Sequence, residues 1–212
     1  MSAVAGPLGC TVIVMAKAPE PGYAKTRLVP ALGPAGAARL AARFLEHTLA
    51  QALAAHLGPV RLACAPSARH PAFARWQGHA GLALEDQAPG DLGQRMAHAF
   101  DSALLGSERA LLIGTDAPAL DAARLAAAAE ALVSERPVFV PTFDGGYVLV
   151  GLTRGMRSLW PALFEAMPWS TREVMPTTRT RLAALGMEPF ELAPVADVDE
   201  PADLVHVPPR WL

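Results

Sequence analysis

The two lysines of the chain lie close together, in a segment that also holds an arginine. Lys17 and Lys25 are the only lysines among 212 residues, and the other sixteen of the 18 lysines and arginines are arginines, one of them Arg27. An ammonium group binds phosphate as a compact point charge, and a guanidinium binds it as a planar, two-pronged donor. We therefore interpret this segment as an anion site that suits phosphate. The alternative is a solvated basic loop that Pro19 and Pro21 only stiffen.

The elements on either side of this segment agree with an anion site. Residues 11–15 form a short apolar run rich in β-branched side chains, which is typical of a buried parallel strand. Residues 33–55 carry apolar side chains at helical spacing. Phosphate commonly binds between a strand and a helix, at the carboxyl end of a parallel sheet.

An aspartate follows a second apolar run in the same way. Asp116 comes directly after the strand predicted at residues 110–113, with Gly114 before it and Pro118 after it. A carboxylate at the carboxyl end of a strand projects into the crevice where open α/β sheets bind ligands, and it suits Mg²⁺ or Mn²⁺. The alternative is a cap for the next helix, although Asp121 is better placed for that purpose.

Two further polar clusters have competing interpretations. The carboxylates of Asp197 and Asp199 precede Pro201, and the residues alone favour ordinary helix-start chemistry there, because acidic side chains stabilise a helix amino end. Gly145 and Gly146 form either a hairpin turn or a point of close backbone approach to a ligand. The residues themselves do not decide between these two.

Several polar residues are predicted to begin helices. Asp91 and Gln94 have the spacing of a capping box, in which each side chain bonds the backbone amide of the other. Ser170 and Thr171 also look like caps. None of the six histidines has a metal-ligand spacing with a partner, and Cys64 is interpreted as a core residue.

Strands and helices alternate along most of the chain. This order predicts an α/β fold, a three-layer α/β/α sandwich, and the short turn before the strand at 147–152 predicts a mixed, mostly parallel sheet. No repeat or change in composition divides residues 1–212, so we expect a single domain. Further strands are expected at 60–65, 82–85, 137–141 and 188–192, and further helices at 70–77, 121–133, 159–167 and 170–185.

The composition narrows the class of protein. A net charge of −2 argues against a general nucleic-acid surface, and 52% hydrophobic residues are enough for a proper core. Two cysteines are too few for a disulfide framework, and residues 1–10 lack the basic segment of a secretory signal. No apolar run reaches membrane-spanning length. We expect a soluble, cytoplasmic protein that binds neither nucleic acid nor membrane.

Five motifs together resemble a known group of proteins. KAPEPGYAKTRL, GDLGQRM, LIGTDAP, DGGYVLVGL and DVDEPADL occur in the order found in bacterial GT-A-like members of the nucleotide-diphospho-sugar transferase superfamily. Within it, the chain is similar to the group named glycosyltransferases associated with radical-SAM/selenodomain proteins and arsenosugar biosynthesis. The resemblance covers about residues 11–204 and implies a GT-A fold.

The resemblance also implies roles for particular residues. It places a divalent metal, Mg²⁺ or Mn²⁺, on Asp116 and Asp199, which raises Asp199 above the helix-start interpretation. Lys25, Arg27 and Asp116 would be the catalytic residues. The acceptor or sugar pocket would be lined by Asp144, Gly145, Gly146 and Tyr147, and the nucleotide would be bound by Ala16, Lys17, Pro21, Gly22, Lys25, Arg27, Gly90, Asp91, Gly93, Arg95 and Thr115.

The chain departs from the superfamily at one point, and this guides the functional hypothesis. Pro19 and Pro21 stand where nucleotidyltransferases usually have a glycine-rich loop, and each proline removes an amide donor for a triphosphate. Our first hypothesis is a metal-dependent transferase that binds a nucleotide-diphosphate sugar and passes the sugar to a small acceptor. The alternatives are a nucleotidyltransferase that releases pyrophosphate and a non-catalytic nucleotide-binding module. The base, the sugar, the acceptor and the oligomeric state are left open.

Overall fold

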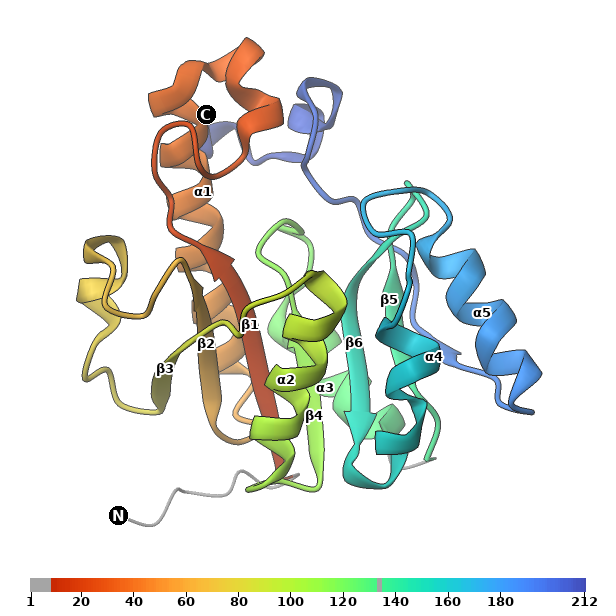
Figure 1. Ribbon diagram of the computed structural model, residues 1–212. Coiled ribbons are helices and arrows are strands. Elements are labelled where there is room, and N and C mark those ends of the chain that lie inside the picture. The colour runs from red at the N-terminus through yellow and green to blue at the C-terminus, as the bar shows by residue number, and fades with distance from the viewer. Residues whose placement is uncertain (1–8, 133–134) are drawn as a thin grey trace.

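The computed structural model describes residues 9–132 and 135–212, and its strands form one sheet. Their order is β3-β2-β1-β4-β6-β5-β7 (Figure 1). Among the described strands only β6 runs against its neighbours, so the prediction of a mixed, mostly parallel sheet is confirmed. The strands are β1 (Cys10–Lys17), β2 (Val60–Ala65), β3 (Leu82–Asp86), β4 (Arg109–Ile113), β5 (Val138–Pro141), β6 (Tyr147–Thr153) and β7 (Phe190–Glu191).

Helices cover both faces of this sheet and complete the three layers. One hydrophobic core joins the sheet to α1 and α3, and a second joins the other face to α2, α4 and α5 (Figure 1). The helices are α1 (Val29–Ala54), α2 (Leu92–Leu104), α3 (Ala122–Ala131), α4 (Trp160–Phe164) and α5 (Val174–Ala184). Short 3₁₀ helices are η1 (Thr26–Leu28), η2 (Pro71–Trp76), η4 (Arg154–Leu159), η5 (Pro201–His206) and η6 (Pro209–Trp211). In the described part of the chain, no helix combines the length and hydropathy needed to span a bilayer.

Local sequence signals explain where two of the helices begin. The Asp91 carboxylate accepts the Gln94 amide proton at 2.9 Å, and the Gln94 side chain accepts that of Asp91 at 2.9 Å, so the predicted capping box before α2 is confirmed. Asp121 caps α3 by accepting from the Arg124 amide at 2.9 Å. Both aspartates are thus used at helix amino ends, where a carboxylate satisfies a free amide.

Other predicted helix boundaries are wrong. Helix α1 begins at Val29, but its backbone is interrupted at Gly33, whose φ of 68° is not helical, so the long run predicted to start at residue 33 does follow this interruption. Ser170 and Thr171 do not cap α5, which begins at Val174; the Thr171 hydroxyl instead donates to the Pro168 carbonyl and accepts from the Glu173 amide. The predicted helix at 159–167 corresponds to α4, which ends at Phe164, and residue 159 belongs to η4. The last residue of the helix predicted at 121–133 lies outside the described residues.

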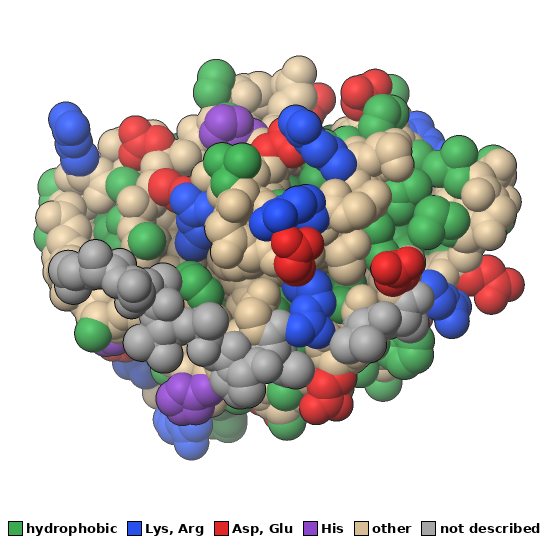
Figure 2. Space-filling model, turned by 90° about the horizontal axis from the view of Figure 1, so that it is seen from below, with side chains coloured by type: hydrophobic (Ala, Val, Ile, Leu, Met, Phe, Trp, Pro, Cys, Tyr) green, Lys and Arg blue, Asp and Glu red, His purple; other side chains and the backbone are tan. Residues whose placement is uncertain are grey.

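The two ends of the sheet differ in character. At the amino ends of the parallel strands, acidic and basic side chains lie next to one another (Figure 2). Arg154 and Glu108, which flank β6 and β4 at this end, form an ion pair of 2.7 Å. The opposite end, where the parallel strands finish, is hollowed and holds the candidate site.

Close packing between α2 and α4 depends on a glycine. A Cβ at Gly93 would overlap the carbonyl oxygen of Phe164 and come within 3.2 Å of the Trp169 ring. The same two helices bring Phe100 and Phe164 together with stacked rings at 5.9 Å. Gly93 therefore allows the first turn of α2 to approach the α4 backbone.

We predict that Gly93→Ala lowers the free energy of unfolding by about 1–3 kcal/mol, the usual cost of overpacking, which exceeds the helix-propensity gain of up to about 1 kcal/mol. Gly106→Ala is the matched control, because a Cβ there meets nothing within 4 Å. Urea titration of both variants measures the difference. Equal stability of the two variants would show that α2 and α4 can separate without cost.

Candidate functional site

A cavity of about 600 Å³ opens at the carboxyl end of the parallel strands. It reaches from the β1 loop across the ends of β1 and β4 to the start of β6. The residues that line it include eleven of the predicted site residues: Ala16, Lys17, Lys25, Arg27, Arg95, Thr115, Asp116, Asp144, Gly146, Tyr147 and Asp199. The other six, Pro21, Gly22, Gly90, Asp91, Gly93 and Gly145, are not among its lining residues.

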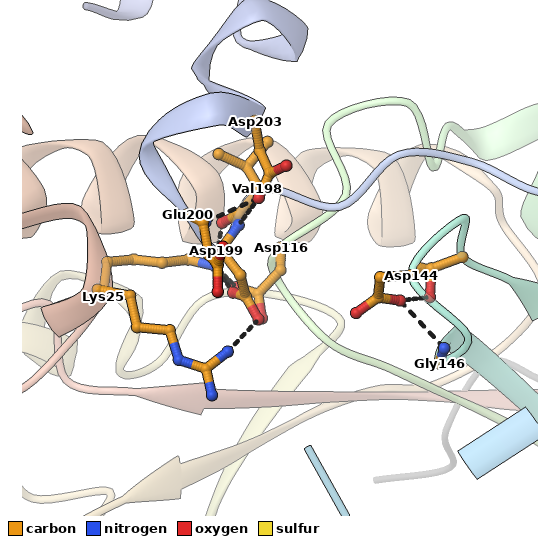
Figure 3. Close-up of polar contacts among 10 residues, drawn as sticks. Lys25, Asp116, Asp144, Gly146, Val198, Asp199, Glu200 and Asp203 are labelled. Atoms are coloured by element: carbon orange, nitrogen blue, oxygen red, sulfur yellow. Dashed lines mark hydrogen bonds and ion pairs between the residues drawn. The ribbon is translucent and has the colours of Figure 1, made fainter. Parts of the chain in front are cut away.

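Three of the predicted residues meet at one point of this cavity. Lys25 Nζ lies 2.6 Å from Asp116 Oδ1 and 2.8 Å from Asp199 Oδ1 (Figure 3). The same nitrogen donates to the Val198 carbonyl at 2.7 Å. The two aspartates, which the sequence analysis placed on one metal ion, therefore face each other across the lysine ammonium group.

The environment of Lys25 favours its charged form. Its side chain is only 8% exposed, and the Phe44 ring lies 5.6 Å from Nζ. Burial alone would lower the pKa of Lys25, but the carboxylates of Asp116 and Asp199 outweigh this effect and raise the pKa above its ordinary value. The residue also has left-handed backbone angles, φ 51° and ψ 41°, directly before η1. This conformation is uncommon outside glycine and has a cost in backbone strain.

The acidic residues Asp199, Glu200 and Asp203 have two different roles. Glu200 and Asp203 form a capping box for η5, and Asp203 also accepts from the Asp199 amide at 3.0 Å. Helix-start chemistry thus explains these residues, while the Asp199 carboxylate remains directed at Lys25. The Val198 amide donates to the Asp116 carbonyl at 2.9 Å and fixes the segment against the end of β4.

Asp197 is a cavity residue that the sequence analysis noted but did not assign to the site. Burial, followed by the nearby Asp144 carboxylate, raises the pKa of Asp197 to about 6, and Asp199 and Asp116 add to the effect. The cavity thus gathers four carboxylates beside four basic side chains, and three of the carboxylates, Asp116, Asp144 and Asp199, lie close enough to Asp197 to raise its pKa. A positively charged ligand, or a cation bound with a phosphate, would reduce their mutual repulsion.

The double glycine has a structural task as a turn. Asp144 accepts hydrogen bonds from the Thr142 hydroxyl and, at 3.0 Å, from the Gly146 amide (Figure 3). Gly145 has a φ of 95°, and a Cβ there would overlap the Arg172 backbone. This explains the Gly145–Gly146 pair as a tight turn, while Asp144 and Gly146 still line the cavity.

The cavity wall opposite Lys25 contains residues that sequence reasoning missed. Trp169, Ser170 and Thr171 lie there beside Tyr147, whose ring meets that of Trp169 edge-on at 6.4 Å. Ser170 has a left-handed φ of 62°. Among the described residues, Trp169 Nε1 is the one buried side-chain nitrogen or oxygen without a hydrogen-bond partner. Ser and Thr are common both at helix caps and in turns, so the sequence did not indicate that Ser170 and Thr171 line the cavity.

Gln87 is a second missed residue, at the other end of the cavity. Its amide donates to the carbonyls of Ala16 at 3.2 Å and Ala63 at 2.9 Å, and so ties the ends of β1 and β2 together. Its remaining oxygen faces Arg95 Nη1 at 3.5 Å, while Arg95 Nε donates to the Gly90 carbonyl. A lone glutamine in a loop gives no sequence signal for such a bridge.

The donor set of Asp116 and Asp199 is compatible with a divalent cation. Carboxylate oxygens are the ligands that Mg²⁺ prefers, and here two of them converge on one positive charge. The described residues contain no group of three or more His, Cys, Asp or Glu side chains arranged around an ion. An ion held by this pair would therefore take its other ligands from phosphate and water.

Known proteins share both sequence and structure with this chain. The family model described as "Uncharacterized protein conserved in bacteria (DUF2064)" matches residues 48–171, more than half of the chain. The crystal structure of a candidate nucleotide-diphospho-sugar transferase from Desulfovibrio desulfuricans G20 is 30% identical, with a TM-score of 0.83 over 92% of this chain and 84% of that chain. No curated protein matches the chain in sequence.

More distant solved structures share the fold. The synthetase for CMP:2-keto-3-deoxy-manno-octonic acid, complexed with CTP, is 13% identical with a TM-score of 0.56, and the match covers 93% of this chain and 96% of that chain. Rv0371c from Mycobacterium tuberculosis H37Rv, in complex with manganese, is 16% identical with a TM-score of 0.57, over 94% and 97% of the two chains. The sheet and its helices therefore define an α/β protein of the nucleotide-diphospho-sugar transferase type. The chain belongs to the bacterial family DUF2064, a family of this kind.

The raised pKa of Asp197 predicts a specific pH dependence. An unfolded aspartate has a pKa near 4, so the folded protein binds this proton more tightly, and the resulting stabilisation is lost as the pH rises through about 6. Asp197→Asn removes the ionised carboxylate. We predict that, in metal-free buffer at pH 7.5, this variant melts at a higher temperature than the wild type, and that the difference shrinks toward pH 4.5.

Thermal melts across this pH range measure the effect. Asp91→Asn is the control, because Asp91 is a helix cap outside the cavity and asparagine caps equally well. A melting difference for Asp197→Asn that does not change with pH would show that the Asp197 carboxylate ionises without penalty.

Proposed function

We propose that the protein is a divalent-metal-dependent transferase that binds a nucleotide-diphosphate sugar and transfers the sugar to a small acceptor. The observation that carries the proposal is the convergence of Lys25, Asp116 and Asp199 at one point of the cavity, with Lys17 and Arg27 on the same lining. Such a mixture of fixed cations and convergent carboxylates suits a diphosphate and its metal ion.

The reaction needs the departing diphosphate to be stabilised. The bond between the anomeric carbon of the sugar and the diphosphate oxygen breaks, and an acceptor oxygen bonds to that carbon and loses its proton. In this proposal Lys17 and Arg27, which line the cavity, neutralise the diphosphate; the Arg27 side chain is 56% exposed and open to a ligand. A divalent ion on Asp116 and Asp199 would supply further positive charge at the same end. Tyr147 and Trp169 also line the cavity, and in this proposal they lie beside the sugar and the acceptor.

Nucleotidyl transfer to a phosphorylated metabolite, with release of pyrophosphate, is the second candidate. This candidate is supported by the fold that the chain shares with a synthetase complexed with CTP. The loop after β1 argues against it, because several of its amides are used within the loop. Those of Glu20, Tyr23 and Ala24 donate to carbonyls of the same loop at 2.8–3.2 Å, and two prolines have no amide hydrogen to offer. The loop therefore gives few backbone donors to a triphosphate.

A ligand screen followed by product analysis separates the candidates. Melting temperatures are measured with Mn²⁺ and with each common nucleoside diphosphate, triphosphate and nucleotide-diphosphate sugar, because a ligand of the native state raises its stability. Each nucleotide or nucleotide-diphosphate sugar that binds is then incubated with the protein and a mixture of small acceptors. Release of a nucleoside diphosphate supports sugar transfer, and release of pyrophosphate supports nucleotidyl transfer. Tight binding without turnover of any mixture would instead indicate a non-catalytic module.

Asp116→Asn tests the proposed metal ligand. We predict that it weakens Mn²⁺-dependent nucleotide binding by about 100-fold or more, since even an outer partner of a metal ligand is worth about 10–100-fold. Calorimetric titration with and without Mn²⁺ measures the change. Asp121→Asn is the control, because Asp121 caps α3 outside the cavity. Unchanged Mn²⁺-dependent affinity in folded Asp116→Asn protein would exclude Asp116 as a ligand.

A further inference from the structure

We propose that Lys25 is a built-in substitute for the metal ion: it occupies the carboxylate pair until a nucleotide phosphate draws it away, so that metal and nucleotide bind together. This inference rests on the proposed function, because it assumes that Asp116 and Asp199 accept a divalent cation. It assigns two alternative positions to one side chain.

The ammonium group of Lys25 has no hydrogen-bond donor left for a phosphate. It carries three N–H groups. Three oxygens lie within 2.8 Å of Nζ: Asp116 Oδ1, Asp199 Oδ1 and the Val198 carbonyl. Lys25 therefore cannot bind a phosphate in the way the sequence suggests while it keeps these contacts.

The same contacts exclude a metal ion between the two carboxylates. Mg²⁺ binds its oxygen ligands at about 2.0–2.1 Å. Nζ already lies 2.6 and 2.8 Å from the two Oδ1 atoms, so an ion bound by both would stand beside the ammonium group, and the two positive charges would repel strongly in this half-buried setting. Metal binding by this pair thus requires that Lys25 leave.

The neighbourhood of Lys25 provides a destination for the displaced side chain. Lys17 and Arg27 line the same cavity, and Arg27 is only 4.0 Å from Asp199 Oδ2, at the edge of the pair. A diphosphate held by these two side chains offers new acceptors to the Lys25 ammonium. Lys25 also has a left-handed backbone, a conformation that is often found where the chain is strained at a functional site.

The first experiment measures Mn²⁺ binding without nucleotide, from the signal of free Mn²⁺ in electron paramagnetic resonance. Lys25→Met removes the competing charge and keeps a chain of similar length, and Lys17→Met removes the other lysine of the same cavity. We expect Lys25→Met to bind Mn²⁺ about tenfold or more tightly than the wild type, since a repelling charge is gone. Lys17→Met should change the affinity less than threefold. Equal affinity of Lys25→Met and wild type, both folded, would overturn the proposal.

A second experiment uses the wild-type chain and therefore does not depend on a variant that folds. Protein labelled with ¹⁵N-lysine gives two side-chain ammonium resonances, because the chain has two lysines, and Lys17→Met assigns them. We expect Mg²⁺ alone to leave the Lys25 resonance in place, and Mg²⁺ with a nucleoside diphosphate to move it. An equal shift of the Lys25 resonance at the same Mg²⁺ concentration without nucleotide would contradict the proposal, and so would Mg²⁺ that binds the carboxylate pair while the Lys25 resonance stays in place.

The two proposals fail in different ways. If no nucleotide binds, the proposed transferase function is wrong, while Mn²⁺ binding by Lys25→Met still reports whether the lysine holds a cation site. If nucleotide-sugar turnover is found but Lys25→Met gains no Mn²⁺ affinity, the transferase proposal stands and the substitution of metal by lysine is wrong.

Discussion

The contact of one ammonium group with two carboxylates organises the open end of this molecule. Lys25 joins the loop after β1, the end of β4 and the segment before η5, three parts of the chain that are remote in sequence. Without that positive charge, Asp116, Asp197 and Asp199 would repel one another across the cavity. The arrangement of the carboxylates at this end of the sheet therefore depends on one buried cation.

Sheet topology brings the other groups to this end. Strands β1, β4 and β5 run in one direction and deliver the residues that follow them to the same edge, while β6 runs the opposite way and begins there with Tyr147. After β7 the chain continues parallel to β5, and Val195 pairs with Thr142 just beyond the end of β5. Residues from six separate segments, together with Ala41 of α1, thus line one cavity.

Much of the fold follows from local signals in the sequence. Strand β2 has the predicted bounds, and Asp91 and Asp121 cap the predicted helices, because apolar runs and cap residues act over a few positions. The site was only partly predictable. Lys25 and Asp116 were singled out from the residues and Asp199 only through the family resemblance, and the direct contact among the three is a long-range result of packing. Trp169 and Gln87 were missed, because their positions depend on backbone turns and carbonyls contributed by other segments.

The long separation between Lys25 and Asp199 has a consequence for biosynthesis. The two residues stand 174 positions apart, so Asp199 is synthesised long after Lys25. During synthesis the β1, β2 and β4 part of the sheet can form first, since folding of a growing chain proceeds from its amino end. At that stage Lys25 faces Asp116 alone. The nascent protein therefore lacks half of the carboxylate pair around Lys25 until the segment that holds Asp199 has been made and has docked.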